Sequence, residues 1–167
     1  FTALLAAGDR VGIAAIGPHD CWLPPGAGTE HAVRGRETLA TDPALAPTPP
    51  EDTFYRSLWF RRFRRQIPGN TQVLLFSPLT DEYPASVARR LDAYGHLVTV
   101  LSPDVTAPTG GHGAGSDPET IEPGRGLVAL ERRNRLRDLR AAGLRVMEWR
   151  ERSFPVAVAT ASARWSR

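Results

Sequence analysis

The sequence predicts a doubly wound α/β fold, in which a mostly parallel sheet carries helices on both faces. Its short hydrophobic runs are continuous rather than alternating, which is typical of strands buried on both sides. Strands and helices alternate along the chain, and at two places a single glycine separates a helix from the next strand, as in right-handed parallel crossovers. Because ligands bind at the carboxyl ends of such strands, we expect a site among residues 17–20, 77–82 and 102–104.

Length and composition are those of one folded domain spanning residues 1–167. Hydrophobic residues make up 41% of the chain and charged residues 23%. No hydrophobic run approaches the about 20 residues needed to span a membrane. The single cysteine excludes a disulfide framework and a multi-cysteine zinc site. The chain has no lysine, and 18 acidic residues offset its 21 arginines, so the net charge of +3 gives weak support to nucleic-acid binding.

The N-terminal part is predicted to contain two strands and a helix. Residues 1–8 have the pattern of the last turns of a helix closed by a glycine, so we expect a fragment whose first strand lies upstream. The wholly apolar residues 11–16 predict a buried strand, and residues 21–23 predict a short second strand. Thr29 is the predicted N-cap of a helix that ends near residue 40.

An arginine-rich helix is predicted over residues 53–66, after a Pro-rich insertion at residues 41–52. Either Asp52 or Thr53 is expected to cap this helix. Its hydrophobic residues approximate helical spacing and predict one inward face: Tyr55, Leu58, Trp59, Phe63 and Ile67.

Two strand–helix–strand units follow, and they share a strand. The first joins strands at residues 72–77 and 97–101 through a helix that Gly95 closes. Its predicted inward side chains are Val87, Leu91 and Tyr94.

The second unit crosses a Gly- and Pro-rich insertion at residues 105–126 to a helix at 127–142 and a strand at 144–149. We expect the arginines of this helix to face outward. Its predicted inward side chains are Leu127, Leu130, Leu136 and Leu139. A terminal helix is predicted over residues 155–165.

The chain lacks the patterns of the common catalytic and phosphate-binding sites. Neither the turn at residues 26–29 nor the Gly-rich stretch at residues 110–116 has the Gly-Lys-Ser/Thr of a phosphate loop. The chain has no Gly-x-Ser-x-Gly motif, its four histidines are scattered, and Cys21 has the surroundings of a small buried residue. We therefore expect no enzyme activity and no cofactor in this segment.

The arginine-rich helix offers a nucleic-acid-binding alternative. Residues 59–65, WFRRFRR, interleave aromatic rings with arginines, as single-strand binders do. Helical spacing instead puts Trp59 and Phe63 on one face, which favours a core helix with a solvated basic face. The residues that the alternative requires are Arg61, Arg62, Arg64 and Arg65.

Several segments, in their order along the chain, resemble a known family. They are GDRVGIAAI at 8–16, WLPPGAG at 22–28 and VLLFS at 73–77, with RRNRL at 132–136 and VMEW at 146–149. In this order they resemble the von Willebrand factor A-like domain. More narrowly, they are similar to a bacterial and archaeal family of unknown function whose genes often accompany MoxR-type AAA ATPases.

The resemblance implies a Rossmann-like sheet with a metal-ion-dependent site at its carboxyl edge. That site begins with Asp-x-Ser-x-Ser, which this sequence lacks, so Mg²⁺ is implied only if the motif lies upstream. The positions that match the rest of the site are Thr29 and Ser77, followed by Asp81, while Pro78 stands where the family often has a carboxylate. A degenerate or absent metal site is expected, because acidic residues at such rims more often cap helices and turns.

Two functions follow from these observations. The first is a non-enzymatic protein-interaction module, an adaptor for a protein partner such as a MoxR-type AAA ATPase. The resemblance implies a cytoplasmic location, either free or as the cytoplasmic domain of a membrane-anchored protein. The alternative is a nucleotide- or nucleic-acid-binding α/β domain that uses the helix at residues 53–66, with an affinity that falls steeply with salt.

Overall fold

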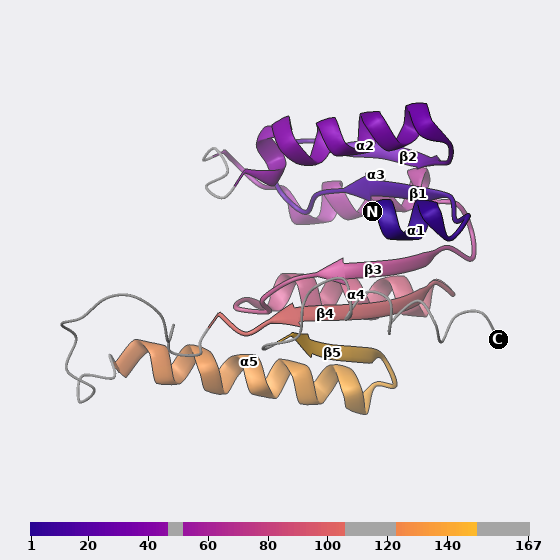
Figure 1. The fold of residues 1–167 in the computed structure, drawn as a ribbon. Coiled ribbons are helices and arrows are strands. Elements are labelled where there is room, and N and C mark those ends of the chain that lie inside the picture. Colours follow the sequence, from indigo (N-terminus) through magenta and orange to yellow (C-terminus); the bar gives the residue numbers. More distant parts are fainter. Residues whose placement is uncertain (47–51, 106–122, 150–167) are drawn as a thin grey trace, which may run out of the picture. The chain divides into compact units, whose positions relative to one another are not determined.

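A computed structural model describes residues 1–46, 52–105 and 123–149 (Figure 1). These residues fall into two compact units, one up to residue 68 and the other from residue 69 on. The predicted terminal helix at 155–165 and most of the insertion at 105–126 lie outside the described residues. In the described part of the chain, no helix is both long enough and apolar enough to cross a membrane.

The first unit is built on a two-stranded antiparallel ladder. Strand β1 pairs with β2 so that Ile13 lies opposite Leu23 and Ala14 opposite Trp22. The elements of this unit are α1 (Thr2–Ala6), β1 (Val11–Ala14), β2 (Trp22–Gly26), α2 (Thr29–Thr41), the 3₁₀ helix η1 (Pro43–Leu45) and α3 (Arg56–Gln66). The predicted strand over residues 11–16 is present but shorter, and the prediction that it is buried is wrong, because no residue of β1 is fully buried. After the turn at residues 17–20 the chain runs back as β2, which pairs antiparallel with β1.

The two predicted helix caps of this unit are wrong. Thr29 is the first residue of α2, and Gly28 holds the N-cap position with a φ of 87°, without a side-chain cap. Helix α3 begins only at Arg56, and the side chain of Asp52 accepts a hydrogen bond from the adjacent Thr53 N–H at 2.6 Å. The side chain of Asp52 is thus used in a local bond and does not cap the helix; short polar side chains often bond to nearby backbone groups in this way.

The second unit contains a three-stranded parallel sheet in the order β3–β4–β5. Its elements are β3 (Gln72–Phe76), α4 (Glu82–Ala93), β4 (Leu97–Pro103), α5 (Pro123–Ala141) and β5 (Arg145–Trp149). The predicted pair of strand–helix–strand crossovers is confirmed here. Gly95 and Gly143 both have a φ of 86°, which suits a glycine that ends a helix just before a strand. The protein is therefore a mixed α/β structure with a parallel sheet flanked by helices.

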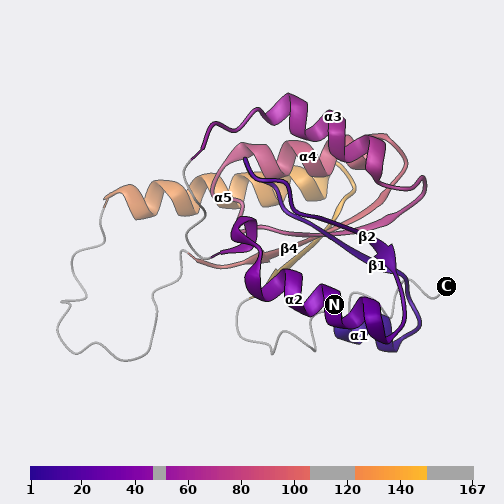
Figure 2. The same cartoon turned by 90° about the horizontal axis from the view of Figure 1, so that it is seen from above.

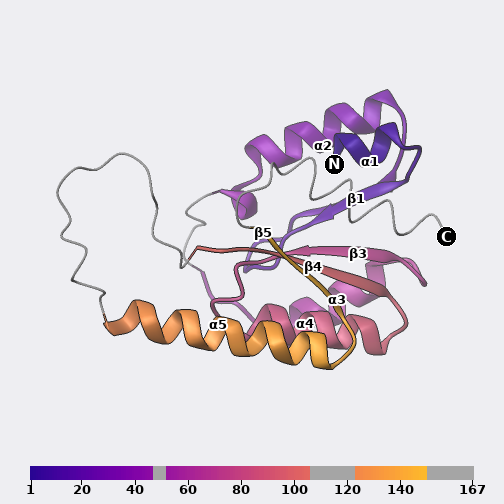
Figure 3. The same cartoon turned by 60° about the horizontal axis from the view of Figure 1, so that its bottom comes forward.

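Helices α4 and α5 lie side by side on one face of this sheet (Figures 2 and 3). The strand order explains the arrangement, because two right-handed crossovers that progress in the same direction place both helices on the same side. Side chains alternate along each strand, so Val100 and Ser102 of β4 and Glu148 of β5 share the helix-covered face. Leu101 and Met147 share the opposite face.

Only part of each predicted inward stripe is buried in the second unit. Val87 and Leu91 of α4 are buried as predicted, whereas Tyr94 is 53% exposed. On α5, Leu136 and Leu139 are buried, but Leu127 and Leu130, 58% and 50% exposed, are not. Figure 3 shows the reason, since the first turns of α5 reach past the strands and have no sheet beneath them.

Candidate functional site

The carboxyl ends of β3, β4 and β5 meet at one edge of the parallel sheet, where the sequence predicts a site. Ser77 directly follows β3, Ser102 lies near the end of β4, and Glu148 lies near the end of β5. Both serines are buried. Polar groups from α5 complete this edge, so its chemistry is decided by residues far apart in the sequence.

The buried polar centre of the edge is Arg132, in the middle of α5, which is only 1% exposed. Its Nε donates to the carbonyl oxygen of Pro78 at 3.1 Å. Its Nη2 donates to Ser102 Oγ at 3.0 Å and to the carbonyl oxygens of Ser102 and Pro103, each at 3.3 Å. One planar guanidinium therefore satisfies backbone groups after β3 and at the end of β4.

Two carboxylates balance the charge of Arg132. Its Nη1 lies 3.5 Å from Glu148 Oε2 and 3.9 Å from Asp104 Oδ1. Glu148 also accepts from Arg140 Nη2 at 2.8 Å, so it joins two arginines of α5 to β5. Buried charges persist only when they are paired and hydrogen-bonded, and this arrangement meets that condition.

The loop between β3 and α4 is held by a second arginine of the same helix. Arg135 Nη1 donates to the carbonyl oxygens of Leu79 and Thr80 at 3.1 and 3.0 Å. Leu79 is fully buried with a φ of 57°, a left-handed conformation that is rare for a residue other than glycine. Its N–H donates to Ser77 Oγ at 3.1 Å. A strained backbone conformation of this kind is kept only where several surrounding contacts hold it in place.

The predicted metal-site residues have local structural roles. Ser77 Oγ accepts the bond from Leu79, and Asp81 caps α4 by accepting from Tyr83 N–H at 2.8 Å. The capping interpretation of Asp81 is therefore confirmed. Ser77 and Asp81 lie in the second unit near the end of β3, whereas Thr29 lies in the first unit at the start of α2.

The donor set at this edge does not fit Mg²⁺. In the ranges that the structure describes, no group of three His, Cys, Asp or Glu side chains could hold a metal ion. The carboxylate of Glu148, which points to this edge, is already 3.5 Å from a guanidinium nitrogen. Mg²⁺ needs oxygen ligands in a near-octahedral array, and a fixed positive charge among them opposes a second cation.

The four arginines singled out on α3, Arg61, Arg62, Arg64 and Arg65, are all exposed. Arg62 forms an ion pair with Asp20, which precedes β2. The aromatic side chains between these arginines pack on one another: Trp59 and Phe63 stack with centroids 5.1 Å apart, and Trp22 meets Phe63 edge-on at 5.8 Å. The expected solvated basic face is present, but the predicted inward face is wrong in its centre, because the buried residue of α3 is Phe60, at 1% exposed. Of the predicted face, Trp59, Phe63 and Ile67 are half-buried, while Tyr55 and Leu58 are exposed.

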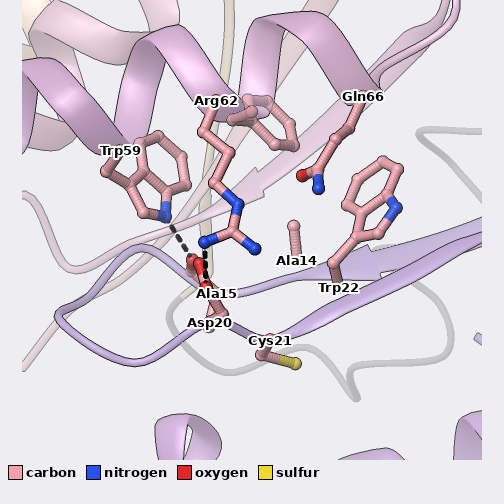
Figure 4. A pocket seen from close by; sticks show the side chains of 9 residues that line it. Ala14, Ala15, Asp20, Cys21, Trp22, Trp59, Arg62 and Gln66 are labelled. Carbon is pink, nitrogen blue, oxygen red and sulfur yellow. Dashed lines mark hydrogen bonds and ion pairs between the residues drawn. The ribbon is translucent and has the colours of Figure 1, made fainter.

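A shallow pocket lies between α3 and the β1–β2 ladder of the first unit (Figure 4). Its walls include Trp22, Cys21, Arg62 and Gln66, and its volume of about 20 Å³ is room for roughly one water molecule. Trp59 Nε1 donates to the carbonyl oxygen of Ala15 at 3.0 Å, which fixes the helix on the ladder.

Two of the described histidines, His31 and His96, hold parts of the fold together, whereas Nε2 of His19 is buried without a hydrogen-bond partner. His31 Nε2 donates to the carbonyl oxygen of Val11 at 2.6 Å. His96 Nδ1 accepts from Thr71 N–H at 3.3 Å. His112 and the Gly-rich stretch around it lie outside the described residues.

Cys21 is buried, and its thiol has a raised pKa. Burial is the main cause, and the hydrogen bond to the Asp42 carboxylate with its negative charge adds to it, so the pKa of Cys21 rises to about 11. The prediction of a small buried residue is confirmed. A thiol that stays protonated at neutral pH is a poor nucleophile.

The raised pKa of Cys21 predicts slow alkylation and a pH-dependent stability. The thiol ionises at about 8.5 when unfolded, so unfolding releases a proton between that pH and about 11, and stability falls as pH rises through this window. We expect iodoacetamide at pH 8 to react with the folded protein at least about 100-fold more slowly than with the urea-unfolded chain. A Cys21→Ala variant should lose less stability than the wild type as pH rises from about 8.5 to about 11.

Sequence reasoning missed Arg132, although a signal was present. Arg132 precedes the buried Leu136 by four residues and Leu139 by seven, so all three share one helical stripe. An arginine on the buried stripe of a helix requires partners, and the carboxyl edge supplies them. The predicted stripe through Leu127 and Leu130 does not continue into Leu136 and Leu139 with regular spacing, which hid this pattern.

Comparison of the chain with protein-family models, with curated proteins and with solved structures finds no match. The functional proposal below therefore depends on the geometry of the two units and on the sequence resemblance given above.

Proposed function

We propose that this chain is a non-enzymatic protein-interaction module with a von Willebrand A-like, doubly wound fold, and that it works in the cytoplasm without a metal ion. The observation that supports the proposal is the carboxyl edge of the parallel sheet, where the buried guanidinium of Arg132 is bonded to Pro78 and Ser102 and paired with two carboxylates. We therefore assign the edge a role in structural stability rather than in catalysis.

The parallel sheet supports the proposed fold. Helices α4 and α5 cover one face, and the opposite face is largely apolar, with Leu74, Phe76, Leu101, Met147 and Trp149. A doubly wound fold needs a second layer on that face, because an apolar sheet surface is stable only when it is covered. This pattern is what a von Willebrand A-like sheet requires of its two faces.

The resemblance points to a MoxR-type AAA ATPase as the partner. The test is retention of a purified, nucleotide-free ATPase of this type on the immobilised chain, once with Mg²⁺ and once with EDTA. Equal retention in both buffers is expected, because the donor set at the carboxyl edge does not fit Mg²⁺. A AAA ATPase of another type serves as the control and should not be retained.

Two results contradict the proposal in different ways. Retention that requires Mg²⁺ overturns the metal-independent mechanism, while no retention in either buffer overturns the choice of partner. Arg132→Lys provides a check on the edge, because it should weaken stability without making retention depend on Mg²⁺.

A further inference from the structure

The first unit carries an exposed, strongly basic surface along α3. We call it the α3 surface, and it consists of Arg61, Arg62, Arg65 and Gln66 on α3 together with Trp22 of β2. Helix α3 carries five arginines and no acidic residue. Arg61 and Arg65 are four residues apart and therefore lie on the same side of the helix.

The ion pair between Arg62 and Asp20 indicates what this surface recognises. The two side chains are 57% and 55% exposed, so the pair lies in solvent, and exposed pairs of this kind contribute little to stability. A carboxylate from another molecule can replace Asp20 on Arg62 at little cost. The structure thus displays a carboxylate bound in an exchangeable way beside two further exposed arginines.

The aromatic side chains beside the arginines favour a peptide over a nucleic acid. A single-stranded nucleic acid needs open ring faces on which its bases stack. Trp59 and Phe63 instead stack on each other, and Trp22 packs against Phe63 in a T-shaped contact, so part of their ring surface is already covered. The pocket beside Trp22, about 20 Å³, is far too small for a base.

We propose that the α3 surface binds an acidic peptide segment of a partner protein. One carboxylate of the segment replaces Asp20 on Arg62, others pair with Arg61 and Arg65, and the backbone passes the Gln66 amide beside Trp22 (Figure 4). Charge complementarity selects the partner, and it also accelerates the encounter. This inference rests on the proposed function as an interaction module and names the surface that it uses.

The experiment measures the binding of a fluorescein-labelled peptide of eight glutamates by fluorescence anisotropy at 50 mM salt. Replacing both Arg61 and Arg65 with alanine should raise the Kd at least about fivefold. The matched control is Arg133→Ala with Arg137→Ala, which removes the same charge from exposed positions four residues apart on α5. This control should change the Kd less than about twofold.

A gain of binding is the more specific expectation. Asp20→Ala frees Arg62 and should tighten binding of the peptide by about two- to fivefold. Asp138→Ala removes the same negative charge next to Arg137 on α5, and it should leave the Kd nearly unchanged. Far-UV circular dichroism of each variant shows whether it is folded.

Four outcomes overturn the inference. Tighter binding of a 12-mer of deoxythymidine, lost in the same double variant, would assign the surface to nucleic acid. If the α3 and α5 variants change the Kd equally, binding depends only on the net charge of the protein and not on the α3 surface. No binding of the peptide would remove the site. If the MoxR-type ATPase is still retained by the Arg61/Arg65 variant, the interaction module stands and only its assigned surface is wrong.

Discussion

Replacing Arg132 with methionine is expected to lower the free energy of unfolding by about 3–5 kcal/mol. Methionine keeps the apolar stem but cannot donate to the carbonyl oxygens of Pro78 and Ser102. It also removes a cation from Asp104 and Glu148, whose side chains are only 12% and 23% exposed. Polar groups that lose their partners inside a protein carry the full cost of desolvation. Urea unfolding followed by far-UV circular dichroism measures the change.

Two further variants show whether the geometry of Arg132 or only its charge matters. Arg132→Lys retains the charge, but a lysine ammonium cannot reproduce the planar set of donors, so it should also destabilise the protein clearly. Arg137→Ala, at a side chain that is 75% exposed, should change stability by less than about 0.5 kcal/mol. A loss below about 1 kcal/mol in Arg132→Met would mean that the edge is not held by this side chain.

The Leu139→Ala variant should lose about 2–5 kcal/mol of stability. Leu139 is fully buried on α5, on the side that faces the sheet. Truncation removes its hydrophobic contacts and leaves a cavity that the neighbouring strands cannot fully close. The same urea titration measures the loss.

Leu127→Ala on the same helix is the matched control. Leu127 is 58% exposed, so the same chemical change should alter stability by less than about 0.5 kcal/mol. Similar losses at Leu127 and Leu139 would show that the inward stripe of α5 continues to its first turns, as the sequence predicts. A small loss at Leu139 alone would place this helix differently on the sheet.

The second unit was largely predictable because its signals are local. A continuous apolar run, a helical pattern and a closing glycine occur in sequence order at residues 72–101 and again toward residue 149. Gly95 and Gly143 ended their helices as expected, since only glycine adopts a positive φ there at little cost. The sequence pattern therefore predicted both strand–helix–strand crossovers.

The first unit was less predictable because its pairing is not local. The run over residues 11–16 has the composition of a buried parallel strand, yet β1 pairs antiparallel with a β2 that contains Pro24 and Pro25. Proline has no N–H to donate, so Pro24 and Pro25 limit which edge of β2 can pair with another strand. This is consistent with a ladder of only two strands. Helix starts shifted as well, because Thr29 and Asp52 do not cap the helices that follow them.

The candidate site divides in the same way. Sequence alone located the carboxyl edge, through Ser77 and Asp81 after a strand, and located the basic helix, through Arg61 to Arg65. Only the tertiary structure brought Arg132 to that edge, 54 residues along the chain from Pro78, and paired Arg62 with Asp20. Local composition and spacing determine which elements form, because they act over a few residues. The partners of a charged side chain depend on which elements pack together, and no local pattern encodes that.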